Sequence, residues 1–144
     1  MGDPAFEAAF QAARKSLSEG GIPIGAALAR NGGIIAAGHN ERVQRADPIA
    51  HGEMSALRSA GRQATYRDTT LYTTLAPCAM CAGTMIQFKI PRVVVGEAVT
   101  FPGELELLRS RGVEVVVLDD QRCVDMMNSF QTEHAALWAE DIAE

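Results

Sequence analysis

The stretch HGEMSALRSAGRQATYRDTTLYTTLAPCAMC, residues 51–81, decides the fold of this chain. It opens where a helix is expected to begin. Asp47-Pro48 is a helix-start signal, because it offers an N-cap side chain followed by proline at the first helical position. Gly61 is a stop signal for the same helix. His51 and Glu53 therefore fall in the first turns of the predicted helix.

The second half of the stretch predicts a strand that leads into another helix. Residues 69–75 alternate threonine with leucine and tyrosine, which is typical of a strand. Pro77 then begins a helix, and the three-residue spacing of Cys78 and Cys81 places both thiols on one helix face. Because a helix N-terminus carries partial positive charge, it lowers the pKa of a nearby thiol and favours the thiolate that binds metals.

One imidazole and two thiolates form a good zinc ligand set, and His51, Cys78 and Cys81 supply it. Three protein ligands leave the fourth tetrahedral position to water, which is typical of a catalytic zinc site rather than a structural one. Glu53 is too close in sequence to His51 to be an easy fourth ligand. It is well placed to take a proton from that water, so we expect it to be the catalytic acid and base.

The rest of the chain predicts a five-stranded mixed sheet with helices on both faces. The expected strands are residues 22–29, 34–37, 69–75, 92–95 and 113–118. Outside the stretch above, helices are expected from Asp3-Pro4 to Gly20, from Glu104 to Arg111, from Asp119 or Asp120 to about Phe130, and in a short segment capped by Thr132. A helix between the fourth and fifth strands implies that these two strands are parallel.

Composition limits the partners and the compartment. A chain of 144 residues is long enough to bury one core, so residues 1–144 are expected to form a single domain. The net charge of -5 argues against a nucleic-acid partner, which usually meets a basic surface. Three cysteines do not make a disulfide framework and suit a reduced, cytoplasmic setting. No apolar run is long enough to cross a membrane, and the N-terminus lacks a signal core.

With these motifs in place, the chain resembles the cytidine deaminase superfamily and is most similar to the fungal-type cytosine deaminases. H-x-E followed by P-C-x-x-C is the known signature of zinc nucleobase deaminases. The resemblance covers nearly the whole chain, and the combination of Gly38-His39-Asn40 with the Trp138 and Asp141 tail is specific to the cytosine branch. The matching segments are residues 20–25, 38–40, 51–53, 71–75, 77–81, 94–97, 138 and 140–142.

The resemblance implies a three-layer α/β/α sandwich that forms homodimers and holds one zinc ion per chain through His51, Cys78 and Cys81. Glu53 would shuttle protons. The expected substrate-binding residues are Asn40 and the Gly52 amide at the polar edge of the base, Asp141 as acceptor for a ring N–H, Phe101 and Trp138 as walls, and Ile24 beneath. Two residues depart from the family pattern: Val43 stands where an aromatic residue is usual, and Ala79 replaces an acidic one.

The implied reaction is hydrolytic deamination of a free nucleobase, cytosine plus water giving uracil plus ammonia, as in pyrimidine salvage. A free base, a small-molecule substrate, is favoured over a nucleoside because Arg42 occupies the position at which nucleoside deaminases carry a carboxylate for ribose. The alternatives are a deaminase of another small ring (guanine, isocytosine or creatinine) and a tRNA adenosine deaminase. Outside enzymes, a zinc-stabilised interaction domain and a redox-active C-x-x-C remain as competing interpretations.

Overall fold

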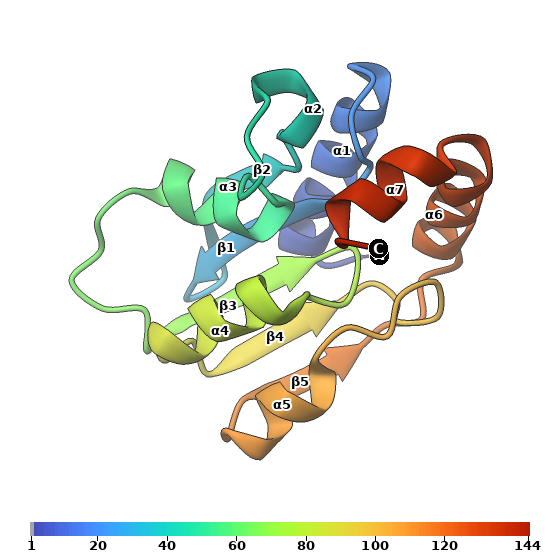
Figure 1. The fold of residues 1–144 in the computed structure, drawn as a ribbon. Helices are drawn as coiled ribbons and strands as arrows, with labels where there is room; N and C mark the ends of the chain where they lie inside the picture. Colours follow the sequence, from blue (N-terminus) through green and yellow to red (C-terminus); the bar gives the residue numbers. More distant parts are fainter. Residues whose placement is uncertain (1) are drawn as a thin grey trace.

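The computed structural model describes residues 2–144 and contains a five-stranded mixed sheet (Figure 1). Its strands are β1 (Gly25–Arg30), β2 (Gly33–His39), β3 (Thr69–Thr73), β4 (Arg92–Val95) and β5 (Glu114–Val117). They lie in the order β2-β1-β3-β4-β5. β1 is antiparallel to β2 and β3, whereas β3, β4 and β5 are parallel to one another. The predicted mixed sheet and the parallel pairing of the last two strands are confirmed.

Seven helices accompany the sheet within residues 2–144: α1 (Pro4–Ser18), α2 (Arg42–Arg45), α3 (Gly52–Ala60), α4 (Ala79–Gln87), α5 (Leu105–Ser110), α6 (Gln121–Glu133) and α7 (Ala135–Asp141). Figure 1 shows α3 and α4 in front of the sheet, α1 behind it, and α7 across the end to which the parallel strands point. The three-layer arrangement implied by the resemblance is confirmed. In the described part of the chain, no helix has the length and apolar character needed to cross a bilayer.

Side-chain alternation along the strands explains why both faces of the sheet carry helices. Leu71 and Val93 point into one apolar cluster, which α3, α4 and α5 complete with Leu57, Met85 and Leu108. Their neighbours Tyr72 and Val94 point into a second cluster on the opposite face, where α1 and α6 pack. Strands buried on both faces are typical of a parallel sheet covered by helices. Each fully buried aliphatic side chain contributes roughly 1.5–3 kcal/mol.

Helix ends follow local capping chemistry. The Asp3 carboxylate accepts a hydrogen bond from the Ala5 N–H at 2.9 Å, and Asp120 accepts one from the Arg122 N–H at 2.9 Å. Each satisfies a backbone donor that the helix itself leaves free. Gly61 ends α3 with a φ of 72°, a conformation that glycine adopts without strain. These three predicted helix boundaries are confirmed.

The predicted start of the metal-binding helix is wrong by several residues. Asp47 does not cap α3, because its carboxylate accepts the Ile49 N–H at 3.0 Å and closes a local turn instead. The helix begins at Gly52, and His51 is the extended residue before it. Cys78 likewise precedes α4 rather than lying in its first turn. Both ligands therefore sit at the N-cap position, where the backbone changes direction and aims the side chain across the helix end.

Two further expectations differ from the structure. Thr132 does not begin the final helix, since α6 runs on to Glu133 and His134 separates it from α7. β1 begins at Gly25, so residues 22–24 form a lead-in rather than part of the strand. Ile22 and Ile24 of this lead-in are still buried, in a third cluster with Phe130 and Trp138 beside α6 and α7. Apolar runs predict burial more safely than they predict strand ends.

We expect Gly25→Ala to destabilise the fold. A β-carbon at this position would lie 2.1 Å from the Ala9 carbonyl oxygen and 2.5 Å from the Ala13 nitrogen, both in the backbone of α1. Because backbone atoms cannot rotate away, α1 would have to shift, and the free energy of unfolding should fall by about 1–3 kcal/mol. Urea denaturation followed by circular dichroism measures this change.

Gly33→Ala is the matched control, because Gly33 begins the next strand and a β-carbon there comes no closer than 3.5 Å to the Arg30 carbonyl oxygen. Its free energy of unfolding should stay within about 0.5 kcal/mol of the wild-type value. Equal losses in both variants would show that the contact between α1 and β1 is not the reason.

Candidate active site

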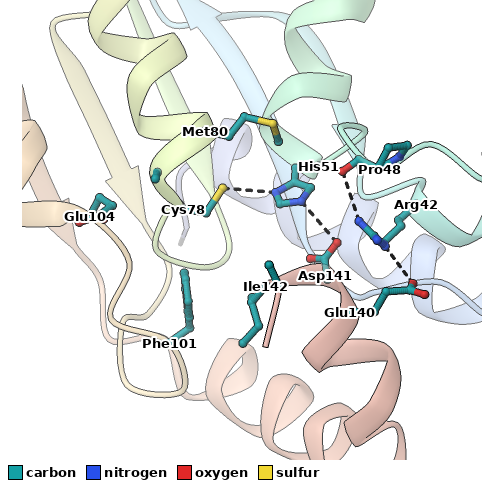
Figure 2. Close-up of a pocket in the computed structure, with 12 residues that line it drawn as sticks. Arg42, Pro48, His51, Cys78, Met80, Phe101, Glu104, Glu140, Asp141 and Ile142 are labelled. Carbon is teal, nitrogen blue, oxygen red and sulfur yellow. Dashed lines mark hydrogen bonds and ion pairs between the residues drawn. The ribbon is translucent and has the colours of Figure 1, made fainter.

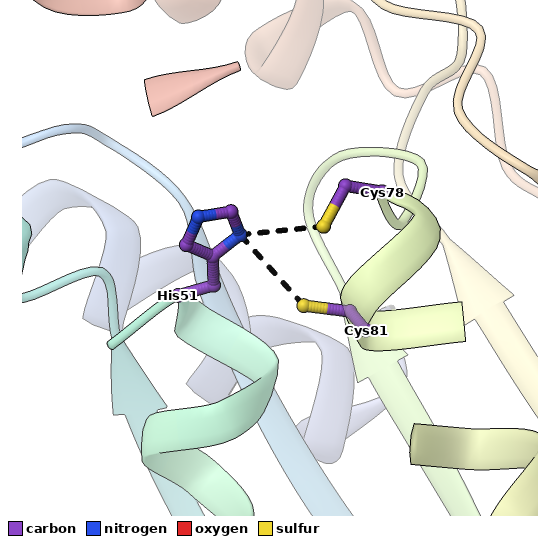
Figure 3. Close-up of side chains that lie close together, drawn as sticks. All are labelled: His51, Cys78 and Cys81. Carbon is purple, nitrogen blue, oxygen red and sulfur yellow. Dashed lines mark hydrogen bonds between the residues drawn. The ribbon is translucent and has the colours of Figure 1, made fainter. Parts of the chain in front are cut away.

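Two helix N-termini bring the three predicted metal ligands together (Figure 3). His51 precedes α3, while Cys78 and Cys81 come from the start of α4. His51 Nδ1 lies 3.4 Å from Cys78 Sγ and 3.8 Å from Cys81 Sγ, and all three ligand atoms lie within 4.8 Å of one another. Tetrahedral zinc with its usual bond lengths separates nitrogen and sulfur ligands by about 3.6 Å. The donor set and its spacing therefore fit one zinc ion.

The two thiols have opposite pKa shifts. The hydrogen bond from the Cys81 thiol lowers the pKa of Cys78 to about 4 despite partial burial, and the hydrogen bond to His51 adds to this effect. Because the Cys81 thiol donates this hydrogen bond to Cys78, its own pKa is raised, and desolvation raises it further. The pair thus holds one thiolate readily and resists a second negative charge. A divalent cation relieves that resistance, because it favours the deprotonated form of both ligands.

The second nitrogen of His51 faces the C-terminal helix. His51 Nε2 lies 3.4 Å from Asp141 Oδ1, at the end of α7 (Figure 2). Burial alone would lower the pKa of His51, but hydrogen bonds to Asp141 and Cys78 raise it to about 10. A carboxylate on the free nitrogen fixes the ring orientation and leaves Nδ1 directed at the metal position. Asp141 therefore connects the last helix to the metal site.

Glu53 lies in the first turn of α3 and is almost fully buried, with 4% of its surface exposed. Desolvation raises the pKa of its carboxyl to about 7, and the negative charge of Cys78 adds to the rise. A carboxyl group with a pKa near neutrality can both accept and donate a proton under physiological conditions. Glu53 lines the same inner cavity as His51 and Cys78.

Asn40 and Gly52 do not line this cavity but adjoin residues that do: Asn40 contacts Asp141, and Gly52 lies between His51 and Glu53 in the chain. Asn40 is fully buried at the end of β2; its side-chain oxygen accepts the Arg42 N–H at 2.9 Å and its amide nitrogen donates to Asp141 at 3.4 Å. Gly52 has no room for a side chain, since a β-carbon would lie 2.9 Å from the Ile24 carbonyl oxygen. The bare Gly52 backbone thus approaches the segment beneath the cavity more closely than any other residue could.

Apolar side chains enclose the inner cavity, whose volume is about 20 Å³. Ile24 lines it from the lead-in to β1, and the rings of Phe101 and Trp138 meet edge to face with centroids 5.7 Å apart. Of the residues that sequence reasoning named for the site, all but Asn40, Gly52 and Cys81 line this cavity; Cys81 lies with the metal ligands, and the other two are next to lining residues. The structure places Val43 elsewhere: 43% of its surface is exposed, and it lines neither the inner cavity nor the outer pocket.

An open outer pocket of about 490 Å³ adjoins the inner cavity, and the two share His51, Cys78, Phe101, Asp141 and Ile142. Figure 2 shows Arg42 at its rim, where the guanidinium pairs with Glu140 of α7 at 2.9 Å and donates to the Pro48 carbonyl at 3.3 Å. Sequence reasoning missed this pair, because the two residues are 98 positions apart. It also missed the lining residues Leu75, Ala76 and Ile142, because an apolar side chain in the sequence indicates burial but not a place in a binding site.

Comparison with known families agrees with this geometry. Residues 3–97 match the family described as the cytidine and deoxycytidylate deaminase zinc-binding region. A cytosine deaminase from Candida albicans is 50% identical over 142 residues, covering 96% of this chain and 95% of that protein. A tRNA-specific adenosine deaminase from Streptococcus pyogenes is 40% identical over 94 residues, covering 63% of this chain and 59% of that protein.

Solved structures show the same fold. The structure of a tRNA:A34 deaminase superposes with a TM-score of 0.75 at 25% identity, covering 85% of this chain and 97% of that one. A guanine deaminase from Nitrosomonas europaea superposes with a TM-score of 0.77 at 20% identity, covering 92% of this chain and 85% of that one. Sequence profile, full-length relative and zinc-ligand geometry agree, and the chain belongs to the cytidine and deoxycytidylate deaminase family.

Proposed function

We propose that this chain is a cytosine deaminase, a zinc-dependent aminohydrolase that converts cytosine and water to uracil and ammonia. The observation that carries the proposal is 50% identity to the Candida albicans cytosine deaminase along 96% of the chain. The geometry of the site supports it, because a buried carboxyl group stands beside three zinc ligands and an enclosed apolar cavity.

His51, Cys78 and Cys81 would hold one zinc ion per chain, with Asp141 keeping the imidazole in place. When bound, zinc supplies water activation, since it lowers the pKa of a bound water towards ~7. No fourth His, Cys, Asp or Glu joins the ligand cluster within residues 2–144, so one coordination position is left to solvent.

Glu53 would carry the protons of the reaction. As a carboxylate it takes a proton from the attacking water and passes it to the ring nitrogen beside the amino-bearing carbon. That carbon then becomes a better electrophile and accepts the hydroxide. Glu53 next takes the proton of the hydroxyl group now on that carbon and gives it to the amino group. The carbon–oxygen double bond of uracil forms as the carbon–nitrogen bond breaks, and ammonia leaves. The pKa of about 7 suits both directions of transfer.

The base would lie against Ile24, Phe101 and Trp138, which offer apolar and aromatic surface. Its polar edge would meet the Asn40 side chain and the Gly52 amide, and Asp141 would accept a ring N–H. The contacts between Asn40 and Asp141 are 3.4 Å long, at the weak end of hydrogen bonding. Both groups can therefore exchange this contact for a better one with a planar ligand.

The wider biology follows from the family resemblance. We infer a single-domain enzyme of pyrimidine salvage that works in the cytoplasm as a homodimer and does not need a nucleic-acid partner. The reduced cysteines support the compartment, because thiolate ligands persist where disulfides do not form. An exposed Phe88 stacked on Tyr66 with centroids 5.0 Å apart gives the molecule apolar surface that a second subunit could cover.

Two other deaminase activities have weaker support. The tRNA-specific relative covers only 63% of the chain, and the net charge of -5 opposes binding to an RNA backbone. The guanine deaminase shares the fold, but at 20% identity this similarity is not evidence for a shared substrate. A zinc-stabilised interaction domain without activity has no use for a buried carboxyl group at the metal.

Glu53→Gln should abolish most of the turnover and leave the metal in place. Glutamine keeps the size of the side chain but neither accepts nor releases a proton here, so kcat should fall by roughly 10²–10⁴-fold. Zinc per chain, measured by plasma mass spectrometry, should equal that of the wild type. Glu133→Gln is the control, because it makes the same chemical change on an exposed face of α6. Wild-type turnover in Glu53→Gln would remove the role assigned to this residue.

The enzyme should release ammonia from cytosine and leave cytidine almost untouched. Trp138, Asp141 and Ile142 line the inner cavity beside the zinc ligands, and Arg42, at the position where nucleoside deaminases carry a carboxylate for ribose, is already paired with Glu140. The measurement is ammonia release across cytosine, cytidine, guanine, isocytosine, creatinine and adenosine. Comparable rates on cytosine and cytidine would refute ribose exclusion, and activity on guanine without activity on any pyrimidine would replace the proposed substrate.

A further inference from the structure

A third buried carboxylate, besides Glu53 and Asp141, lies four residues before the pocket residue Phe101. Glu97 follows β4 and has none of its surface exposed. Its Oε1 accepts hydrogen bonds from the backbone N–H groups of Val99 at 2.8 Å and Thr100 at 2.9 Å, and its Oε2 accepts the Thr100 hydroxyl. The short loop after Glu97 thus folds around a single side chain.

This loop is fixed to the rest of the site at both ends. The Ala76 N–H donates to the backbone oxygen of Glu97 at 3.0 Å, and Ala76 lines the inner cavity two residues before Cys78. At the other end, the Gln131 side chain of α6 donates to the Thr100 carbonyl at 3.3 Å. The next residue is Phe101, so the loop's position determines where this aromatic ring stands.

Phe101 connects the loop at residues 97–100 to the substrate pocket. It lines both the inner cavity and the outer pocket, and its ring meets Trp138 edge to face. The loop therefore supports a wall from one side, while α7 supports it from the other. If the loop were free, Phe101 could move away from Trp138 and the pocket would open.

We propose that Glu97 is a positioning residue that fixes the Phe101 wall and thereby sets the affinity for the base. It does not touch the substrate and acts through the Val99–Thr100 backbone. A purely structural role does not require a carboxylate, because an apolar side chain of similar volume fills a buried site without the cost of desolvating a charge. The two oxygens of the Glu97 carboxylate hold two backbone N–H groups and a hydroxyl in one arrangement, which an apolar side chain cannot do.

The experiment compares Glu97→Met, which keeps the volume and removes both acceptors, with Glu97→Gln, which keeps one oxygen for the two backbone donors. Thr100→Val is an independent variant that removes only the hydroxyl donor. It tests the same contact if Glu97→Met fails to fold. Val99→Ala is the control: 73% of the Val99 surface is exposed, and its N–H stays in place. Each folded variant is checked for zinc per chain.

Two readouts are used because a general loss of stability changes neither of them below the melting temperature. Trp138 is the chain's only tryptophan, so its emission maximum and its quenching by acrylamide report whether the Phe101 wall has moved. Steady-state kinetics with cytosine separate KM from kcat. The kinetic readout rests on the proposed function, whereas the fluorescence does not; a wild type that is silent on cytosine would refute that function and still leave the positioning of Phe101 testable.

In Glu97→Met we expect red-shifted and more easily quenched Trp138 emission, and a KM raised about tenfold with kcat within about threefold, the effect of a lost pocket contact. Glu97→Gln should lie between it and the wild type, Thr100→Val should shift in the same direction, and Val99→Ala should match the wild type. Unchanged emission, unchanged KM, or a fall in kcat with loss of zinc would each overturn the proposal.

Discussion

The site depends on two helix N-termini that approach each other closely enough for an imidazole and two thiols to share one cation. Such an approach requires close contact between backbones. A β-carbon on Gly38 of β2 would lie 2.7 Å from the Ala56 nitrogen of α3, and one on Gly52 would lie 2.9 Å from the Ile24 carbonyl. Because these two residues are glycines, α3 can pack directly against the sheet. Because zinc tolerates little variation in ligand distance, this packing is a condition for metal binding.

Asp141 joins parts of the chain that meet only in the folded protein. Its carboxylate reaches both His51 and Asn40, which is 101 residues away in sequence. A buried carboxylate is costly unless it has polar partners, and here the partners are a metal ligand and a pocket amide. The packing of α7 over the cavity and the orientation of the zinc ligand therefore depend on the same carboxylate. Folding of the last helix completes a metal centre whose ligands lie in the first two thirds of the chain.

Local signals predicted much of the fold and little of the site's outer part. Residues 92–95 were predicted as a strand with the bounds that β4 has, and Asp3 and Asp120 cap the helices expected of them. Asp47 failed as a helix start because a turn and a helix compete for the same side chain. Ion pairs between distant residues, such as Arg42 with Glu140, cannot be predicted from local sequence patterns. Only the family resemblance assigned Trp138 and Asp141 to the site. Taken alone, Trp138 is as readily a packing residue, and an aspartate near the C-terminus is usually exposed to solvent.

The zinc ligands and the aromatic walls of the cavity come from different parts of the chain. The family match ends at residue 97, after Asn40, Glu53 and all three zinc ligands. Phe101, Trp138 and Asp141 lie beyond it, in the part that forms the walls of the cavity. Glu97 stands at the boundary, with its backbone tied to the metal-bearing segment and its side chain holding the first residues of the wall.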